Sequence, residues 1–249
     1  MKAVIMAGGK GSRLRPLTKR IPKPMLQLLD RPAMEYIVEL LAMHDFNDIT
    51  MTVCYMADVI RDYFSNGKDW GVRIHYQDEI VPLGTAGGVK ALQHQLQETF
   101  VVMSGDALTD FNLSQAMETH RRYGGIATLL LTSINCPLGY GVVDVGEDGR
   151  IQNFIEKPKT WVEGNSYLVN TGIYIFEPEI FQYIPAQQPF DFGRELFPML
   201  LQLKLPLYGF EATGYWSDVG TLQQYYQTQI DMIHGRVHVN LPIELASVF

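Results

Sequence analysis

The chain has 249 residues, of which 47% are hydrophobic, and this is enough for a sizeable core and one large α/β domain. Its formal net charge of −7 argues against nucleic acid as a partner, because a phosphate backbone requires a broad basic face. The two cysteines, Cys54 and Cys136, form neither a disulfide framework nor a zinc pattern. We expect a cytoplasmic protein with reduced thiols, no signal peptide and no membrane span.

Strand and helix patterns alternate along the chain, which predicts a mixed, mostly parallel Rossmann-like sheet with helices on both faces. The expected strands are residues 2–7, 48–54, 72–76, 100–103, 126–132, 141–145, 151–156 and 168–176. The expected helices are residues 33–44, 59–64, 88–97 and 221–233. We predict one domain over residues 1–235, with halves at 1–125 and 126–235. Residues 236–249 are a tail that would begin a further domain in a longer native chain.

A glycine-rich turn follows the first predicted strand. Gly8, Gly9 and Gly11 leave little side-chain bulk, so that a polyphosphate can approach the backbone N–H groups directly. Arg13 and Lys23 bring positive charge to the same turn. The simplest interpretation is a nucleoside triphosphate site, and the alternative is a strand-to-helix turn without a ligand.

Two better-known glycine loops do not fit this turn. A Walker P-loop requires Gly-Lys-Ser/Thr after a four-residue spacer, and the chain has no such sequence. A dinucleotide-binding fingerprint requires glycine at position 14, where Leu14 stands. A nucleotide-dependent oxidoreductase is therefore disfavoured.

Residues 8–14 read Gly-Gly-Lys-Gly-Ser-Arg-Leu and residues 22–24 read Pro-Lys-Pro. Together they resemble the signature of the sugar-1-phosphate nucleotidyltransferases, with mannose-1-phosphate guanylyltransferases the most similar. The matches continue to residues 218–220, Asp-Val-Gly, and so cover nearly the whole chain. The resemblance implies a nucleotide-diphospho-sugar transferase fold, similar to GT-A, with a small β-rich part that binds the sugar phosphate. It implies a nucleoside triphosphate, GTP favoured, and a hexose 1-phosphate, mannose favoured, and it allows a homo-oligomer.

The resemblance also implies which residues bind the nucleotide. Residues 82–87, Pro-Leu-Gly-Thr-Ala-Gly, are similar to a family segment whose backbone approaches the base, and Gln77 stands upstream where relatives often hydrogen-bond it. The neighbouring Asp78 and Glu79 make that alignment ambiguous. The glycines could instead let a helix start close to the sheet. The expected nucleotide-binding residues are Ala7, Gly8, Gly9, Gly11, Ser12, Arg13, Gln77, Gly84, Thr85 and Ala86.

Two aspartates are candidate magnesium ligands. Asp106 follows the buried run at residues 100–103, at the edge of an open α/β sheet where ligands bind, and a turn cap is the alternative. Asp218 lies in a Trp-Ser-Asp-Val-Gly segment that resembles the family's Trp-x-Asp-x-Gly. It could also cap the last helix, but Thr221 is the better cap. Mg²⁺ commonly takes one or two carboxylates and fills its other positions with phosphate oxygens and water.

The second half resembles the family's sugar-phosphate site. Gly141 stands in Tyr-Gly-Val-Val, Glu156 and Lys157 in Phe-Ile-Glu-Lys-Pro, and Asn170 and Thr171 in Asn-Thr-Gly-Ile-Tyr, where relatives have alanine in place of threonine. The resemblance implies that the glutamate accepts hydrogen bonds from sugar hydroxyls and that the lysine holds the sugar phosphate. In isolation, a solvated Glu-Lys edge is the more common arrangement.

The implied reaction is in-line attack of the sugar phosphate on the α-phosphorus of the triphosphate. The catalytic residues implied are Arg13, Lys23, Asp106 and Asp218, with Mg²⁺ as cofactor. The alternatives are a glucose-1-phosphate uridylyl- or thymidylyltransferase and a non-catalytic subunit that senses sugar nucleotides. The subunit is disfavoured because the signature cations and carboxylates are all present.

Overall fold

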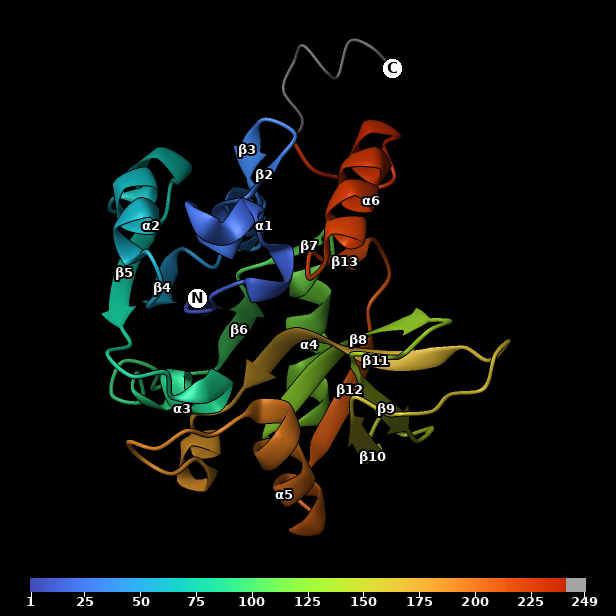
Figure 1. Cartoon of the computed structure of the whole chain (residues 1–249). Coiled ribbons are helices and arrows are strands. Elements are labelled where there is room, and N and C mark those ends of the chain that lie inside the picture. Colours follow the sequence, from blue (N-terminus) through green and yellow to red (C-terminus); the bar gives the residue numbers. More distant parts are fainter. Residues whose placement is uncertain (241–249) are drawn as a thin grey trace.

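A computed structural model describes residues 1–240 of the chain (Figure 1). Its strands are β1 (Lys2–Met6), β2 (Gln27–Leu28), β3 (Arg31–Pro32), β4 (Asp48–Val53), β5 (Arg73–Asp78), β6 (Phe100–Ser104), β7 (Ala107–Thr109), β8 (Ala127–Ile134), β9 (Gly141–Val145), β10 (Ile151–Glu156), β11 (Tyr167–Phe176), β12 (Leu207–Glu211) and β13 (Trp216–Asp218). Its α-helices are α1 (Ala33–Met43), α2 (Ala57–Phe64), α3 (Gly84–Lys90), α4 (Leu113–Tyr123), α5 (Phe197–Gln202) and α6 (Leu222–Ile233).

Short helical turns complete the described part of the chain. Turns of 3₁₀ type lie at Ser12–Leu14, Leu17–Lys19, Lys23–Met25, Lys68–Trp70 and Pro178–Tyr183, and a π-helical turn lies at Phe192–Leu196. Among residues 1–240, no helix has both the length and the apolar character to cross a membrane. Most of the predicted tail, residues 241–249, lies outside the described residues.

One mixed sheet contains nine strands, in the order β10-β9-β11-β6-β1-β4-β5, with β8 paired to β11 and β12. The strands β6, β1, β4 and β5 are parallel neighbours. In the second half of the chain, β11 runs antiparallel to β6, β8 and β9. The expected α/β sheet is thus confirmed, with its antiparallel pairs made by second-half strands. Because β6, β1 and β4 are parallel, their carboxyl ends meet at one edge, where an open α/β sheet binds ligands.

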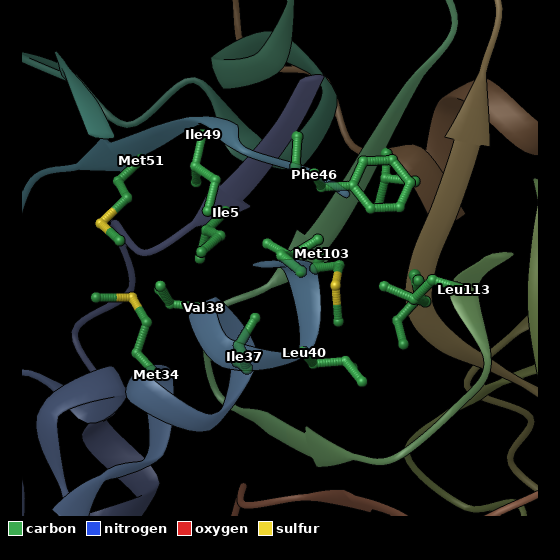
Figure 2. Close-up of a cluster of buried hydrophobic side chains, with 14 of the residues drawn as sticks. Ile5, Met34, Ile37, Val38, Leu40, Phe46, Ile49, Met51, Met103 and Leu113 are labelled. Atoms are coloured by element: carbon green, nitrogen blue, oxygen red, sulfur yellow. The ribbon is translucent and has the colours of Figure 1, made fainter. Parts of the chain in front are cut away.

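The parallel strands β1, β4 and β6 are buried on both faces. On one face, Met34, Ile37 and Val38 of α1 share a core cluster with Ile5 of β1 and Met51 of β4 (Figure 2). Their spacing of three and four residues puts them on one side of the helix. On the other face, a second cluster lies against α3, α5 and the turn at Pro178–Tyr183. This double burial explains the nearly unbroken apolar run of β1.

A bulge interrupts β11 where it passes the edge of the sheet. The register of β11 against β8 shifts between Asn170 and Tyr174, and Gly172 within that stretch has a φ of 79°. Glycine adopts positive φ without the strain a side chain would add, so the Asn-Thr-Gly sequence suits this bend.

Several sequence predictions are corrected. The helix expected at residues 88–97 begins earlier, because α3 spans Gly84–Lys90 and turns follow it to residue 95. The strands β7, β12 and β13 and the helix α5 were not predicted, since three- to six-residue elements carry little periodic signal. Thr221 does cap α6, as its hydroxyl accepts the N–H of Gln224.

Candidate active site

Two carboxylates from distant parts of the chain meet at the carboxyl edge of the sheet. Asp106 follows β6, and Asp218 ends β13, whose ladder with β7 pairs Asp218 with Ala107. The N–H of Val219 donates to the carbonyl of Asp106 at 3.3 Å. Lys23 lies between the two side chains, with Nζ 2.5 Å from Asp106 Oδ2 and 3.4 Å from Asp218 Oδ1.

The charges of this trio are tightly linked. The Lys23 side chain is only 10% exposed, and the Ser104 hydroxyl donates to Asp106 Oδ1 at 2.6 Å. Burial favours the neutral carboxyl of Asp106, but the Lys23 ammonium and the hydrogen bond from Ser104 together hold the pKa of Asp106 below its usual value. Burial, reinforced by the charge of Asp106, raises the pKa of Asp218 despite Lys23. The pair therefore concentrates negative charge that one internal cation compensates only in part.

These residues fit a magnesium ion in chemistry and number. Carboxylate oxygens are the hard donors that Mg²⁺ prefers, and it is usually bound by one or two carboxylates together with substrate phosphates. Within residues 1–240, no group of three or more His, Cys, Asp or Glu side chains is placed to hold a metal without such help. A cation between Asp106 and Asp218 would take the place that the Lys23 ammonium occupies here.

The glycine-rich turn packs directly on this trio. Gly11 has a φ of 57°, and a Cβ added to it would lie 2.8 Å from Cβ of Lys23. The Thr18 hydroxyl donates to the Gly11 carbonyl at 2.7 Å and fixes the turn. Arg13 and Asp218 lie on the same side of Gly220, because a Cβ placed on Gly220 would be 3.4 Å from Arg13 Nη2 and 3.0 Å from Asp218 Oδ2. The sequence analysis expected Arg13 and Lys23 to bring positive charge to this turn. In the structure Lys23 packs against Gly11, and Arg13 lies near Gly220.

A cavity of about 300 Å³ opens at the same edge. Four of the predicted nucleotide-binding residues line it, namely Gly8, Gly9, Gly84 and Thr85, and so does Asp106. Pro82, from the segment expected to approach the base, also lines it. The other lining residues are Met6, Thr52, Glu79, Ser104 and Asp191. The predicted residues Ala7, Gly11, Ser12, Arg13, Gln77 and Ala86 are not among the lining.

The structure places Glu79, rather than Gln77, at the cavity. Gln77 lies on β5, and its amide donates to the carbonyl of Asp78 at 3.2 Å. The N–H of Glu79 donates to the carbonyl of Val53 at 2.9 Å, which turns this residue back over β4. Burial raises the pKa of Glu79, against hydrogen bonds from the Thr52 hydroxyl and the Leu83 N–H that lower it.

A second segment forms the opposite wall of the cavity. The N–H groups of Ala86 and Gly87 both donate to the carbonyl of Phe190 at 3.0 Å. The Thr85 hydroxyl donates to Asp191 Oδ2 at 3.0 Å. Gly84 has a φ of 74°, and an added Cβ would lie 2.7 Å from the Phe190 carbonyl oxygen. This contact was not predicted from the sequence, because residues 184–196 follow no regular pattern.

The predicted sugar-phosphate residues adjoin this wall. Glu156 Oε2 lies 3.0 Å from a Cβ placed on Gly141 and 2.7 Å from one placed on Gly193, so a side chain at either position would push this carboxylate aside. Lys157 has a φ of 49°, is 54% exposed, and lies 3.5 Å from Glu156. Its N–H donates to the Tyr140 carbonyl at 3.0 Å.

The side chains of Asn170 and Thr171 are used by the fold itself. Asn170 Oδ1 accepts the N–H of Gly172, and its Nδ2 donates to the Tyr174 hydroxyl, both at 3.0 Å. The Thr171 hydroxyl is buried and donates to the Leu130 carbonyl at 2.7 Å. The threonine that departs from the family pattern thus serves packing of the bulge, and sugar binding by these two residues stays a prediction.

Comparison with known proteins identifies the family of the chain. The family profile described as "Nucleotidyl transferase" matches residues 2–234. The chain belongs to the nucleotidyl transferase family. Family membership confirms the resemblance predicted from the glycine-rich turn and the Pro-Lys-Pro segment.

Individual relatives of this nucleotidyl transferase differ in the names of their substrates. The chain is 44% identical over 91% of its length to a UTP–glucose-1-phosphate uridylyltransferase of Synechocystis sp., covering 62% of that protein. It is 36% identical over 88% of its length to the mannose-1-phosphate guanyltransferase of Saccharomyces cerevisiae, covering 61% of it. The chain therefore spans about three fifths of the length of these curated relatives.

Solved structures share the fold. A Bacillus anthracis protein described as a glucose-1-phosphate thymidylyltransferase, crystallised with sucrose, superposes with a TM-score of 0.84 at 26% identity, covering 99% of both chains. HddC from Yersinia pseudotuberculosis, complexed with GMP-PN, superposes with a TM-score of 0.79 at 24% identity, covering 93% of this chain and 99% of HddC. The second likeness concerns the fold alone.

Proposed function

We propose that this chain transfers a nucleotidyl group from a nucleoside triphosphate to the phosphate of a hexose 1-phosphate and releases pyrophosphate. The main support for this proposal is the trio of Asp106, Lys23 and Asp218, which lies beside a cavity lined by the two glycine segments. It joins anion-binding backbone to a pair of carboxylates at the ligand-binding edge of the sheet. Family membership supports the same reaction class.

The chemistry requires charge compensation rather than a strong base. A phosphate monoester loses its second proton near pH ~6, so the attacking oxygen is anionic at neutral pH. Two anions must then approach while charge grows on the leaving pyrophosphate. Arg13 and Lys23, both at the glycine turn, would neutralise the triphosphate, and Lys157 would neutralise the sugar phosphate. Loss of one such cation is expected to lower the rate by about 10²–10³.

Asp106 and Asp218 would hold Mg²⁺ in this proposal. The ion would supply electrostatic stabilisation to phosphate oxygens when bound. The carboxylates' own contribution is to stand on two separate chain segments that the β7–β13 ladder fixes together. Lys23, which pairs with them here, would turn to the phosphates.

For the substrate pair we propose GTP and mannose 1-phosphate. The guanyltransferases of several species support it at 34–37% identity over 88% of the chain. The alternative is UTP and glucose 1-phosphate, which the relative at 44% identity supports.

The test is pyrophosphate release across a grid of nucleoside triphosphates and hexose 1-phosphates with Mg²⁺. Asp106→Asn is the blank, because it keeps the side-chain shape and removes the charge. We expect it to abolish turnover while its far-UV circular dichroism matches that of the wild type. Near-normal turnover by Asp106→Asn would refute the role of this carboxylate.

The grid also separates the alternatives. Highest turnover with GTP and mannose 1-phosphate supports the proposed pair, and another dominant pair replaces it while keeping the reaction. If no pair released pyrophosphate but calorimetry still showed binding of a sugar nucleotide, the chain would be a sensing subunit instead.

A further inference from the structure

Asp110 is a buried carboxylate that ties together three segments of the chain near the candidate site. It directly follows β7, and its side chain is 6% exposed. Its Oδ1 accepts the N–H of Tyr215 at 2.6 Å. Its Oδ2 accepts the main-chain N–H of His238 at 2.8 Å and the ring Nδ1–H of the same residue at 3.1 Å. Because an ionised carboxylate has about four acceptor sites, these protein donors satisfy most of them without a ligand.

The carboxylate extends the short ladder that brings Asp218 to Asp106. Strands β7 and β13 pair over only three residues each and form a sheet of their own (Figure 1). Such a two-stranded ladder is marginally stable by itself. One position beyond it, the Asp110 N–H donates to the Tyr215 carbonyl at 3.3 Å. In a regular antiparallel pair the Tyr215 N–H would return to the Asp110 carbonyl, and here the Asp110 side chain accepts that N–H instead.

The main chain around Tyr215 is shaped to receive this carboxylate. Gly214 has a φ of 128°, which residues with a side chain rarely adopt, and a Cβ placed on it would overlap Asp110 Oδ1. In addition, the Thr109 hydroxyl donates to the Tyr215 carbonyl at 2.7 Å. Two side chains at the end of β7 therefore hold the backbone that leads into β13.

Other contacts of β13 act on its side chains. Trp216 Nε1 donates to the Thr171 carbonyl at 3.1 Å, and the Ser217 hydroxyl lies 2.6 Å from that of Thr228. These contacts hold the strand against β11 and α6, whereas Asp110 sets its position along β7. Residues 106–110 thus contain one acid of the candidate metal pair and also the carboxylate that places the segment with the other acid.

We propose that Asp110 is a positioning residue for the candidate metal centre, which fixes Asp218 relative to Asp106 through the backbone of Tyr215. The inference rests on the proposed function, because it concerns the pair of acids that would hold Mg²⁺. Asp110 is not among the residues that line the nucleotide cavity, so its effect reaches that centre only through β13. Its loss should therefore weaken Mg²⁺ binding and lower kcat, while KM for the triphosphate at saturating Mg²⁺ stays unchanged.

The test compares Asp110→Ala with Thr128→Val. Thr128 is fully buried on β8 and bonds to the His120 ring at 2.8 Å, so its replacement also removes a buried hydrogen bond but leaves β13 untouched. The Kd for Mg²⁺ is obtained from the rise of Tm with Mg²⁺ concentration, which needs no turnover. We expect Asp110→Ala to raise this Kd by about 10- to 100-fold and to lower kcat by a similar factor. Thr128→Val should leave both unchanged although it lowers Tm.

Asp110→Asn is the milder variant. Its amide oxygen can still accept the Tyr215 N–H, but the NH₂ group cannot accept the N–H of His238. We expect its Kd for Mg²⁺ to lie between those of the wild type and Asp110→Ala, and it takes the place of Asp110→Ala if that variant does not fold.

An unchanged Kd for Mg²⁺ in the Asp110 variants, or an equal increase in Thr128→Val, would overturn the proposal. It would also fall if Mg²⁺ did not raise the Tm of the wild type. If Mg²⁺ binds but no substrate pair is turned over, the proposed function fails, and the Mg²⁺ titrations still decide the role of Asp110.

Discussion

Replacement of Lys23 by methionine tests the electrostatics of the candidate site. Methionine fills similar space but leaves Asp106 and Asp218 facing each other without their shared cation. At an effective dielectric constant of about 20, the contacts at 2.5 Å and 3.4 Å correspond to about 7 and about 5 kcal/mol of attraction. Desolvation of Lys23 and repulsion between the carboxylates offset much of this.

The net cost of the substitution is expected to be about 3–5 kcal/mol, as for other broken buried pairs. For a chain of this size it lowers Tm by roughly 6–20 °C. Urea unfolding and a thermal scan measure both quantities. Mg²⁺ should raise the Tm of Lys23→Met more than that of the wild type, because the variant's carboxylates have no internal cation to displace.

Lys2→Met is the control for Lys23→Met. Lys2 pairs with Asp48 at 3.6 Å, and its side chain is 39% exposed, so its loss should cost at most about 1 kcal/mol. If Lys23→Met unfolded at the same urea concentration as Lys2→Met, the stabilising role of the Lys23 ion pairs would be refuted. A Lys23→Met protein that is destabilised but gains nothing from Mg²⁺ would refute the metal assignment alone.

Two further predictions concern the cavity wall and a buried histidine. Gly84→Ala should destabilise the fold by about 1–3 kcal/mol and raise KM for the triphosphate, since its Cβ meets the Phe190 carbonyl oxygen at 2.7 Å. Gly71→Ala is the control, because Gly71 also has a positive φ but no atom lies within 4 Å of its added Cβ. If Gly71→Ala raised KM as much as Gly84→Ala, the clash with Phe190 would not be the cause. His120 is 1% exposed, and burial lowers its pKa, with Glu177 opposing and Arg121 adding to the shift. The unfolded state therefore binds the proton more readily, and stability should fall as pH drops below about 6.5. Urea unfolding at about pH 7.5 and about pH 5.5 measures this loss, and a His120→Gln variant with an equal loss would exclude the histidine.

The sequence predicted the edge of the sheet that carries the site. Lys2–Met6 and Phe100–Ser104 read as buried strands because both faces are covered, and parallel strands end at a common edge. The glycine turn and Asp106 follow directly from that pattern. The position of Asp218 came from the resemblance, since a three-residue strand such as β13 has no periodicity to detect.

The sequence could not predict which side chains turn into the cavity. At the end of β5, three polar residues follow one another, and a hydrogen bond from Glu79 to Val53 decides which one enters. Asp191 was missed because it belongs to an irregular segment whose place depends on Thr85, far away in the chain. Lys23 was assigned to phosphates, whereas here it pairs with two carboxylates that only tertiary folding brings to it.

The β7–β13 ladder has a consequence for how the protein is made. It joins Ala107 to Asp218, so the second carboxylate is synthesised 111 residues after the strand residue with which it pairs. A nascent chain that contains β1, β4, β5 and β6 carries Asp106 soon afterwards but still lacks the second acid of the candidate centre. Contacts between residues so distant in sequence also form late, because closing a long loop costs entropy before the contact repays it. The candidate centre is therefore complete only after Asp218 has joined β7 through the β7–β13 ladder.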